Sequence, residues 1–482
     1  MFRHLSFPRS LLFILLTAGI FVIANPAPAI DLAIIGAAIF AAGYVVLKEK
    51  ILLLFLAARP ALDVWRDTVI VGGQNVNAVL AILFFGWAIV MLFKHREKIE
   101  KVPLLGLFTL TGGWFLYSAT YSLDPILSII ETVKFLNIGL IFFLSYIFIK
   151  QEILKPIEIV TAIAAGAAIP LLMGLIQIVF QTGITTFEIQ DRIFGTFAHP
   201  NVFAFFVMFL LFLHHHYSTM SPTAFWEKHH GWRVGIFGIL ILLLLLTYTR
   251  AAWVGLAIYA AMMALLSYRR PSLKILYVLA GIYVILFPAS DWLTRNTDFR
   301  PNDYPIIARL TTRSEEADSV DWRLNLVRSN LRLIVKGPRT TQGFGYGTFP
   351  IVWEHDRPES NETDDSAESH NDYLRLAVEV GVVGLILYCL LLARLAWIAG
   401  RLVLAPPSSY KLLQHNKTTW LRRFRERDLH LFLFGSIVVF GIVSLSDNML
   451  HHTPVLWMIW SIWGTILAEA PWRTSGPNFL DN

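Results

Sequence analysis

The stretch Val234–Tyr248, VGIFGILILLLLLTY, decides the fold class because it carries no charge and is nearly long enough to cross a bilayer. The apolar run Ala251–Tyr268 follows almost at once, and similar runs recur along the chain. A membrane-spanning helix needs about 20 mostly apolar residues. Lipid offers the backbone no hydrogen-bond partners, so spanning segments form helices or closed barrels. The sequence therefore predicts an all-α polytopic membrane protein.

The overall composition agrees with this fold class. Of 482 residues, 56% are hydrophobic and 15% are charged, whereas a soluble domain carries about 25% charged residues. The single cysteine, Cys389, lies in an apolar run, which argues against a disulfide framework and a thiolate metal site. The net charge of +6 is typical of basic residues that anchor membrane helices. Membrane lipids are therefore expected partners and nucleic acid is not.

Basic clusters divide the helix ends into two sides. They lie at Lys48–Lys50, Lys94–Lys98, Lys150–Lys155, Arg269–Lys274 and Arg401–Arg427. The apolar runs predict about 12 to 14 transmembrane helices, including helices centred near residues 18, 38, 54, 282 and 384. If these helices alternate in direction, all the basic clusters fall on one side, which is the cytoplasm under the positive-inside rule.

The N-terminus is open to two interpretations. Arg3 and Arg9 precede the apolar stretch Leu11–Ile23, and Ala27-Pro28-Ala29 follows it. This pattern is typical of either a cleaved signal peptide or a retained first helix. We favour the retained helix because prolines flank the small residues. Both interpretations start the next helix on the outer side.

The predicted organisation has three regions. Residues 1–290 form the N-terminal transmembrane helices, and residues 291–371 form one large external loop that contains short helices. Residues 372–482 form the C-terminal transmembrane helices, with a basic cytoplasmic loop at 397–428. In the external loop, Asp321–Ile334 has apolar residues at helical spacing and predicts an amphipathic helix.

Several polar residues fall on the predicted outer side. Arg192, Arg250 and Arg323 lie there together with His370. A single outer arginine usually reaches towards lipid headgroups, but three of them with a histidine on one face favour a site for an anion such as a diphosphate. Arginine suits that anion because its planar guanidinium keeps its charge and binds two oxygens at once.

His370 is the candidate base at this end of the helices. We expect it in the first turn of a helix, where the positive end of the helix dipole disfavours imidazolium. A neutral ring near pH 7 is able to accept a proton. Glu368 acts in the opposite direction, and the two effects are not ranked by the sequence. Asn371 and Asp447 are candidate supporting residues, and no metal ligands are assigned.

Other polar features have structural interpretations. Arg375 and Glu379 are spaced i, i+4, and Glu131 and Lys134 are spaced i, i+3, so each pair is predicted to interact within its own helix. The glycine-rich Gly343–Gly347, GFGYG, lacks the strand-then-helix context of a dinucleotide site and predicts a bend.

Taken in order, these motifs resemble the O-antigen ligase and polymerase superfamily of bacterial membrane glycosyltransferases. The matching pieces are Arg192–Phe197 with Pro200-Asn201, Thr249–Ala252, Arg323 ahead of Gly343–Gly347, and His370–Leu374 with Gly381 and Gly384. The resemblance extends over roughly residues 100–470 and includes the long outer loop before the histidine.

The resemblance implies a donor glycan on a polyprenyl diphosphate carrier, such as undecaprenyl diphosphate, and a glycan or glycolipid acceptor, such as the core of lipopolysaccharide. It implies that His370 is the catalytic base and that Arg192, Arg323 and Arg250 bind the diphosphate. No cofactor is implied, because arginines can stabilise a leaving diphosphate without a metal. The family also implies inversion at the anomeric carbon and a bacterial inner membrane location, with the site facing the periplasm.

A second class of function is a transporter of a small anion such as bicarbonate. A transporter places ionisable residues near the bilayer midplane, at broken helices. The candidate residues here collect at the predicted outer ends of helices instead, which favours the glycosyltransferase. Ligase and polymerase remain equally compatible with the sequence.

Overall fold

The computed structural model describes residues 47–65, 69–71, 74–99, 102–186, 189–220, 230–266, 319–336, 339–356, 368–404 and 417–470. Within these ranges the helices are α3 (Ile51–Leu62), α4 (Val76–Lys94), α5 (Arg96–Ile99), α6 (Leu105–Ser118), α7 (Pro125–Lys150), α8 (Pro156–Phe180), α9 (Pro200–His215), α11 (His230–Leu246), α12 (Arg250–Leu266), α15 (Ser319–Lys336), α16 (Phe349–Asp356), α17 (Asp372–Glu379), α18 (Gly381–Leu404), α19 (Lys417–Val443) and α20 (Thr453–Glu469). Short helical turns lie at η2 (Lys48–Lys50), η3 (Asp63–Trp65), η4 (His216–Met220) and η6 (Met449–His451). The strands are β1 (Val69–Val71), β2 (Gln74–Asn75), β3 (Ile184–Thr186) and β4 (Ile189–Arg192).

The predicted fold class, an all-α polytopic membrane protein, is confirmed. Five described helices are long and apolar enough to cross a membrane, at Val76–Lys94, Pro125–Lys150, Pro156–Phe180, Pro200–Ser218 and Gly381–Leu404. Two shorter apolar helices lie at Gly231–Leu246 and Arg250–Leu266. The predicted helices near residues 18, 38 and 282, and the N-terminal signal-like stretch, lie outside the described residues.

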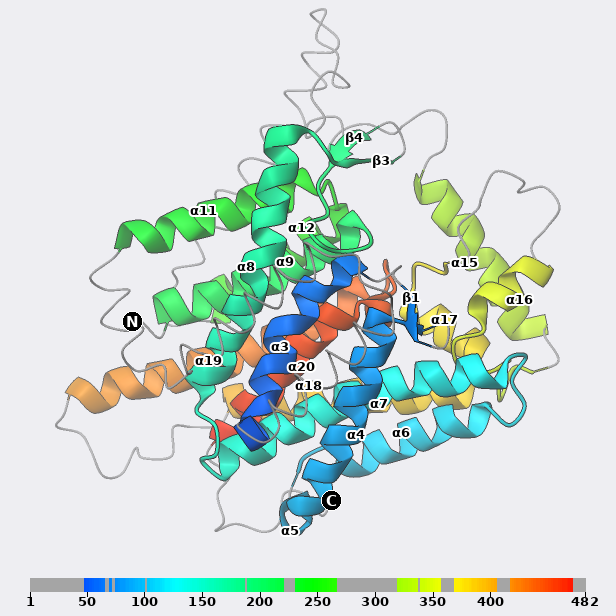
Figure 1. Cartoon of the computed structure of the whole chain (residues 1–482), viewed down its shortest axis with the longest axis horizontal. Coiled ribbons are helices and arrows are strands. Elements are labelled where there is room, and N and C mark those ends of the chain that lie inside the picture. The colour runs from blue at the N-terminus through cyan, green and yellow to red at the C-terminus, as the bar shows by residue number, and fades with distance from the viewer. Residues whose placement is uncertain are drawn as a thin grey trace, which may run out of the picture.

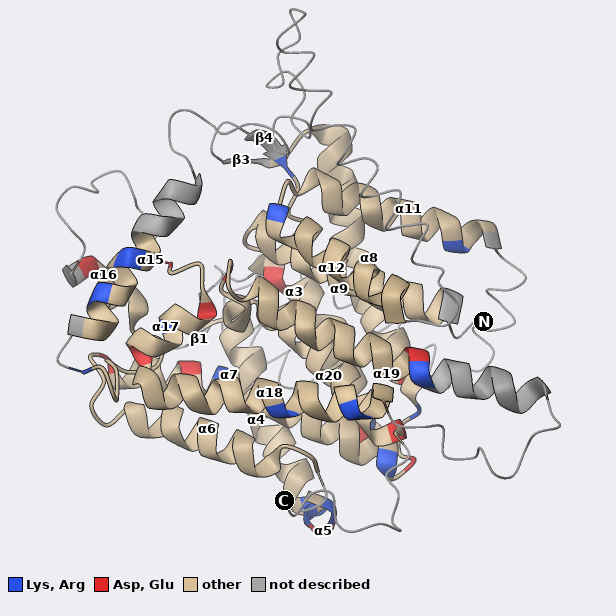
Figure 2. Cartoon of the chain, turned by 180° about the vertical axis from the view of Figure 1, so that it is seen from behind, with Lys and Arg blue, Asp and Glu red and all other residues tan. Residues whose placement is uncertain are grey.

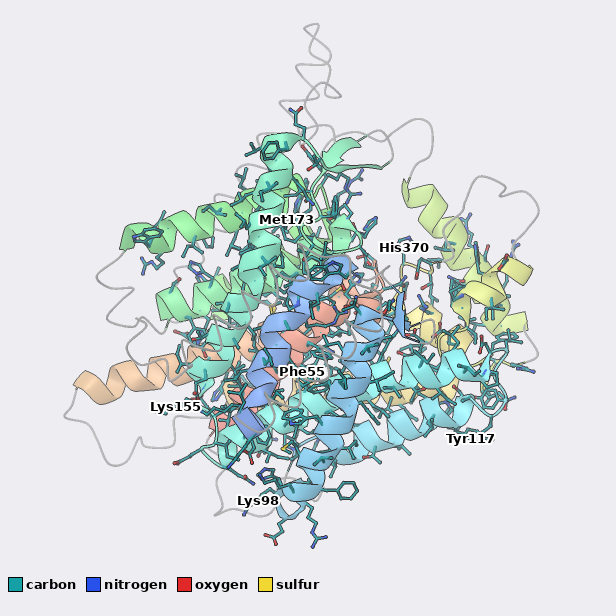
Figure 3. The ribbon with its side chains drawn as sticks, viewed as in Figure 1. Phe55, Lys98, Tyr117, Lys155, Met173 and His370 are labelled. Carbon is teal, nitrogen blue, oxygen red and sulfur yellow. The ribbon has the colours of Figure 1, made fainter. Side chains whose placement is uncertain are left out.

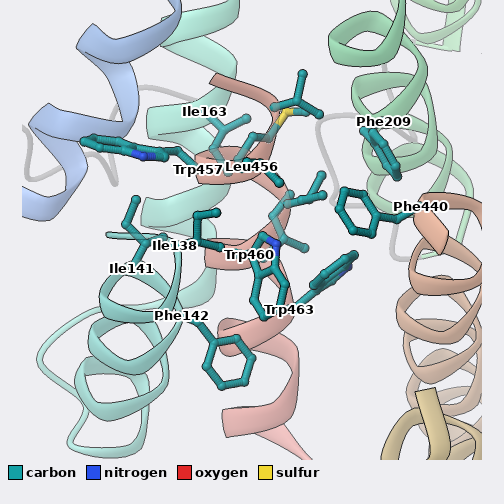
Figure 4. Close-up of a cluster of buried hydrophobic side chains, with 14 of the residues drawn as sticks. Ile138, Ile141, Phe142, Ile163, Phe209, Phe440, Leu456, Trp457, Trp460 and Trp463 are labelled. Carbon is teal, nitrogen blue, oxygen red and sulfur yellow. The ribbon is translucent and has the colours of Figure 1, made fainter. Parts of the chain in front are cut away.

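The core is built around α20, which crosses the middle of the molecule beside α3 (Figure 1). Every residue of α20 from Pro454 to Ala468 is buried. Its tryptophans Trp460 and Trp463 lie between α7 on one side and α9 and α19 on the other, and Trp457 reaches towards α3 (Figure 4). A Cβ at Gly464 would collide with the Phe142 carbonyl oxygen, so this glycine allows the two backbones to approach closely. Small residues and large aromatic rings together pack α20 against α7.

The apolar run that begins at Leu374 is broken into two helices. The chain turns at Gly381, between α17 and α18, where φ is +67°. A side chain there would be strained by the backbone conformation and would also collide with the Thr341 carbonyl oxygen. The prediction of one helix centred near residue 384 was therefore incomplete, because a long-range contact and not the local composition sets the break.

The glycine-rich turn Gly343–Gly347 fills the space beside this break, and the predicted bend is confirmed. The Gly345 N–H donates to the Glu379 carbonyl oxygen at 2.7 Å, and the Phe344 N–H donates to the Val378 carbonyl oxygen at 3.1 Å. On the other side, the Leu123 N–H donates to the Phe344 carbonyl oxygen at 3.0 Å. The turn at 343–347 is thereby tied to both α17 and the loop between α6 and α7.

The amphipathic helix predicted in the external segment is present as α15. Leu326 is buried in a small cluster with Phe349 and Trp353, and Leu333 and Ile334 pack against that cluster. The apolar face of α15 is therefore used for packing. Trp322 and the other side chains at 319–325 lie outside the described part of the structure.

Charged residues gather at the ends of the helices (Figure 2). Most coloured segments in Figure 2 lie at the ends of helices, with long uncharged stretches between them. Lys50 forms an ion pair with Glu158 at 2.9 Å, and Lys94 forms one with Glu49, so three of the predicted basic turns lie together. Near the same end, α19 begins at Lys417, inside the segment that we predicted as a basic loop.

Candidate functional site

Arg192 is the last residue of the short ribbon formed by β3 and β4, in which it pairs with Ile184. Its Nε donates to the Thr247 carbonyl oxygen at 2.9 Å. Its Nη2 donates to Asn201 Oδ1 at 3.2 Å and to Thr249 Oγ1 at 3.3 Å. Burial lowers the pKa of Arg192 to about 10, and Asp447 opposes this shift. The guanidinium therefore keeps its charge at neutral pH while being held in one orientation.

The turn after Arg192 is held by an amide that the sequence analysis missed. Gln177, inside the apolar helix α8, accepts from the Phe194 and Gly195 N–H groups at 2.9 Å each. Its Nε2 donates to the Gly195 carbonyl oxygen at 2.9 Å. The signal available in the sequence was a single amide near the outer end of an otherwise apolar helix. Thr196 adds a second anchor by donating to the Pro60 carbonyl oxygen at 2.8 Å.

Asp447 lies in the loop between α19 and α20, where its carboxylate joins several groups. Oδ2 accepts from Asn201 Nδ2 at 2.7 Å, and Oδ1 lies 2.9 Å from His452 Nε2. The Asn448 N–H also donates to Oδ1, at 2.8 Å. Burial alone would raise the pKa of Asp447, but His452, His370 and the Asn448 N–H lower it to about 2. The structure thus brings Asp447, a predicted supporting residue, against Asn201, the partner of Arg192.

His370 lies just before α17, far from Lys98 and Lys155 at the other end of the bundle (Figure 3). It is one of the groups that lower the pKa of Asp447, so the two side chains lie within electrostatic range. The φ angle of His370 is +48°, a conformation that costs a non-glycine residue about 1 to 3 kcal/mol. The structure therefore places the candidate base within electrostatic range of Asp447 and in a strained backbone conformation.

The predicted position of His370 in the first turn of a helix was wrong. The helix α17 begins at Asp372, and Asn371 is its N-cap, whose Oδ1 accepts from the Tyr373 and Leu374 N–H groups at 3.0 Å each. His370 therefore precedes the cap, because the N-cap needs a short acceptor side chain that Asn371 supplies. Asn371 also donates from Nδ2 to the Leu445 carbonyl oxygen at 3.0 Å, so it anchors the start of α17.

The predicted charge pairs are confirmed. Arg375 Nε lies 2.9 Å from Glu379 Oε1, and Lys134 Nζ lies 2.5 Å from Glu131 Oε1. Arg375 also forms an ion pair with Glu368, at 2.5 Å between Nη1 and Oε2. The charge of Glu368 is therefore shared with Arg375, a partner that the sequence analysis did not assign to it.

The other two predicted diphosphate-binding arginines, Arg250 and Arg323, are located by their positions in helices. Arg250 is the first residue of α12 and follows Thr249, whose hydroxyl contacts both Arg192 and Asn201. Arg323 lies in α15, one turn before the buried Leu326, but its side chain lies outside the described residues. The structure thus brings Arg192, Arg250 and the His370 segment to one end of the bundle and locates Arg323 by its helix alone. Among the described residues, no group of three or more histidine, cysteine, aspartate or glutamate side chains is arranged to hold a metal ion.

A comparison with known families adds an independent observation. Residues 235–389 match the family model described as O-Antigen ligase. The matched segment is narrower than the resemblance seen in the motifs, and it contains Arg250, Arg323 and His370 but neither Arg192 nor Asp447. No curated protein matches the chain. This match supports the O-antigen ligase superfamily for the segment 235–389.

Proposed function

We propose that the protein is a membrane glycosyltransferase that moves a glycan from a polyprenyl diphosphate carrier to a sugar hydroxyl of an acceptor. The observation that carries this proposal is the position of Asp447. Its carboxylate binds Asn201, which in turn binds Arg192, and it lies within electrostatic range of His370. A candidate base within electrostatic range and a fixed cation, linked through Asn201, therefore converge on one buried carboxylate from distant parts of the sequence.

The proposed reaction uses these groups as follows. The acceptor hydroxyl oxygen attacks the anomeric carbon of the donor sugar, and His370 takes the hydroxyl proton. The bond between the anomeric carbon and the diphosphate oxygen breaks, and the carrier diphosphate leaves with the electron pair. Arg192, with Arg250 and Arg323, stabilises the negative charge that develops on the diphosphate. Attack opposite the leaving group inverts the anomeric carbon.

Two features support Arg192 as an anion-binding group in this scheme. Its side chain is only 4% exposed, so its electrostatic effect is less screened than that of a surface arginine. Three protein oxygens hold the guanidinium before a substrate arrives. A donor group that is already oriented needs little reorganisation when charge develops on the substrate.

The proposed roles can be tested by substituting His370. We expect His370→Ala to insert into the membrane normally but to lower glycan transfer by about 100-fold or more, because a positioned base contributes that much. The lipid-linked donor should accumulate and can be measured by mass spectrometry of extracted lipids. His95→Ala is the matched control, because His95 packs on Phe148 at the opposite end of the bundle. Full transfer by His370→Ala would exclude the histidine as base.

The alternative function, transport of a small anion, makes a different prediction. The candidate residues lie at helix ends, between β4 and α9 and between α19 and α20, whereas transporter sites lie near the bilayer midplane. Uptake of labelled bicarbonate by vesicles that contain the protein, unchanged in His370→Ala, would favour transport. Transfer of a glycan without such uptake would favour the enzyme.

We further propose that the site end of the bundle faces the periplasm and that the membrane is the bacterial inner membrane. The basic turns at the opposite end support this orientation through the positive-inside rule. The glycolipids of cells lacking the protein distinguish a ligase from a polymerase. Carriers loaded with long chains would indicate a ligase defect, whereas carriers with single repeat units would indicate a polymerase defect.

A further inference from the structure

The side chain of Asn448 contacts the backbone or side chain of the residues on both sides of His370. Its Oδ1 accepts from Ser369 Oγ at 3.0 Å and from the Asn371 N–H at 3.2 Å. Its Nδ2 donates to Glu368 Oε2 at 2.5 Å. All three contacts join the loop between α19 and α20 to a segment that lies nearly eighty positions earlier in the chain.

These contacts bear on the conformation of His370. The residue has a φ angle of +48°, which few non-glycine residues adopt without support from their surroundings. The Asn448 side chain forms hydrogen bonds with Ser369, before His370, and with Asn371, after it. These bonds restrict the backbone on both sides of the strained residue. Ser369 Oγ contributes locally by accepting from the Asn371 N–H at 3.3 Å.

We propose that Asn448 is a positioning residue that holds the backbone of His370 so that its ring faces the site shared with Arg192. This inference rests on the proposed function, because it concerns the geometry of the proposed base. Asn448 is buried, with 4% of its surface exposed, so water competes little for its hydrogen bonds. Its own N–H donates to Asp447 Oδ1 at 2.8 Å.

The dipeptide Asp447-Asn448 thereby sets the separation of the two halves of the site. Asp447 holds Asn201 and, through it, Arg192, while Asn448 holds the segment around His370. Asp447 and Asn448 are adjacent in the chain and can move little relative to each other. The distance between the Arg192 cation and the His370 base is therefore held nearly constant. Glycan transfer needs this, because the diphosphate and the hydroxyl proton lie on opposite sides of the reacting carbon.

The first experiment compares Asn448→Ala with Asn137→Ala. Asn137 is a buried residue of α7 whose side-chain amide donates to the Ala81 carbonyl oxygen. It lies apart from the site. We expect Asn448→Ala to lower kcat by about 10- to 100-fold, as a displacement of about 1 Å does. The KM for the lipid-linked donor should change little, because Arg192 keeps its partners. Asn137→Ala should keep the wild-type kcat.

A double substitution separates positioning from general damage. If Asn448 acts only through His370, Asn448→Ala should lower residual transfer less than about twofold in the His370→Ala background. An equal loss in both backgrounds would overturn the inference. So would a wild-type kcat for Asn448→Ala when His370→Ala is inactive. Wild-type transfer by His370→Ala would instead overturn the proposed function, so the two failures are distinguishable.

A third experiment exchanges the donor and the acceptor in the hydrogen bond between residues 448 and 368. Asn448→Asp keeps an acceptor for Ser369 and Asn371 but places a carboxylate against Glu368, so we expect kcat to fall about 10-fold or more. Adding Glu368→Gln lets the new amide at 368 donate to the new carboxylate at 448, and kcat should recover. Failure of the second substitution to raise kcat in a folded protein would contradict the proposed role.

Discussion

Asn201 Nδ2 donates to Asp447 Oδ2 at 2.7 Å, and this contact joins residues that are 246 positions apart. Asn201 lies in the first turn of α9, and Asp447 lies in the loop before α20, so the bond connects the start of one core helix to the segment that leads into another. Because Asn201 also accepts from Arg192, the orientation of the guanidinium depends on a carboxylate near the other end of the sequence.

Removing the Asp447 charge should disturb Arg192 without unfolding the protein. We expect Asp447→Asn to lower transfer about 10-fold or more, because charged hydrogen bonds to Asn201 and His452 are replaced by neutral ones. Asp124→Asn is the control, since Asp124 caps α7 and asparagine caps equally well. Steady-state transfer by the two purified variants measures the difference, and equal activity would contradict the proposed coupling.

Keeping the charge at position 192 should not be enough for activity. Arg192→Lys retains a cation but loses the planar fork that contacts Thr247, Asn201 and Thr249. We expect kcat/KM for the lipid-linked donor to fall about 100-fold, as when one preorganised donor is removed. Arg401→Lys, at the far end of α18, should keep wild-type kinetics. A fully active Arg192→Lys would show that charge alone suffices.

The break between α17 and α18 should not tolerate a side chain. Gly381→Ala would place a Cβ against the Thr341 carbonyl oxygen at a φ of +67°, so we expect a loss of at least about 1 to 3 kcal/mol of stability. Gly113→Ala is the control, because a Cβ there meets nothing within 4 Å. Thermal unfolding in detergent compares the two variants. Equal midpoints would mean that the turn at 339–347 moves freely away from α17.

The contribution of Asp372 to stability should fall as the pH rises from about 4 to 7, whereas His199, whose pKa burial lowers to about 4, contributes in the opposite direction. Burial raises the pKa of Asp372 to about 7, although the Leu450 N–H and Ser444 oppose the shift, whereas an unfolded aspartate titrates near about 3.9. Between these pH values Asp372 is protonated in the folded state and ionised in the unfolded state. Its contribution to the free energy of unfolding therefore decreases with increasing pH and becomes constant above about pH 7.

Asp372→Asn isolates this effect. The variant cannot ionise at position 372, so between pH 5 and pH 8 its unfolding midpoint should shift in the stabilising direction relative to the shift of the wild type. Asp124→Asn should keep the shift of the wild type. An Asp372→Asn protein with the wild-type pH dependence would assign the effect to another group.

The sequence predicted the membrane fold and the end of the bundle that holds the candidate site. Apolar runs and basic turns are local signals, and they were enough to place Arg192, Arg250 and His370 at one end. The contacts that orient these residues were not predictable, because Gln177 and Asn448 bind backbone groups that are distant in sequence. The cap at Asn371 likewise depends on a shift of one residue that helix periodicity does not resolve.

The complete burial of α20 has a consequence for how the protein responds to its membrane. Membranes of different thickness tilt or shift the helices that contact lipid. In α8, Ile169, Leu172 and Val179 are exposed apolar side chains, so α8 will follow the bilayer. In α20, Pro454–Ala468 contacts only protein. The position of His452, which precedes α20, is therefore set by the packing of α20 against α7 and not by contact with lipid. The site should keep its geometry in bilayers of different composition.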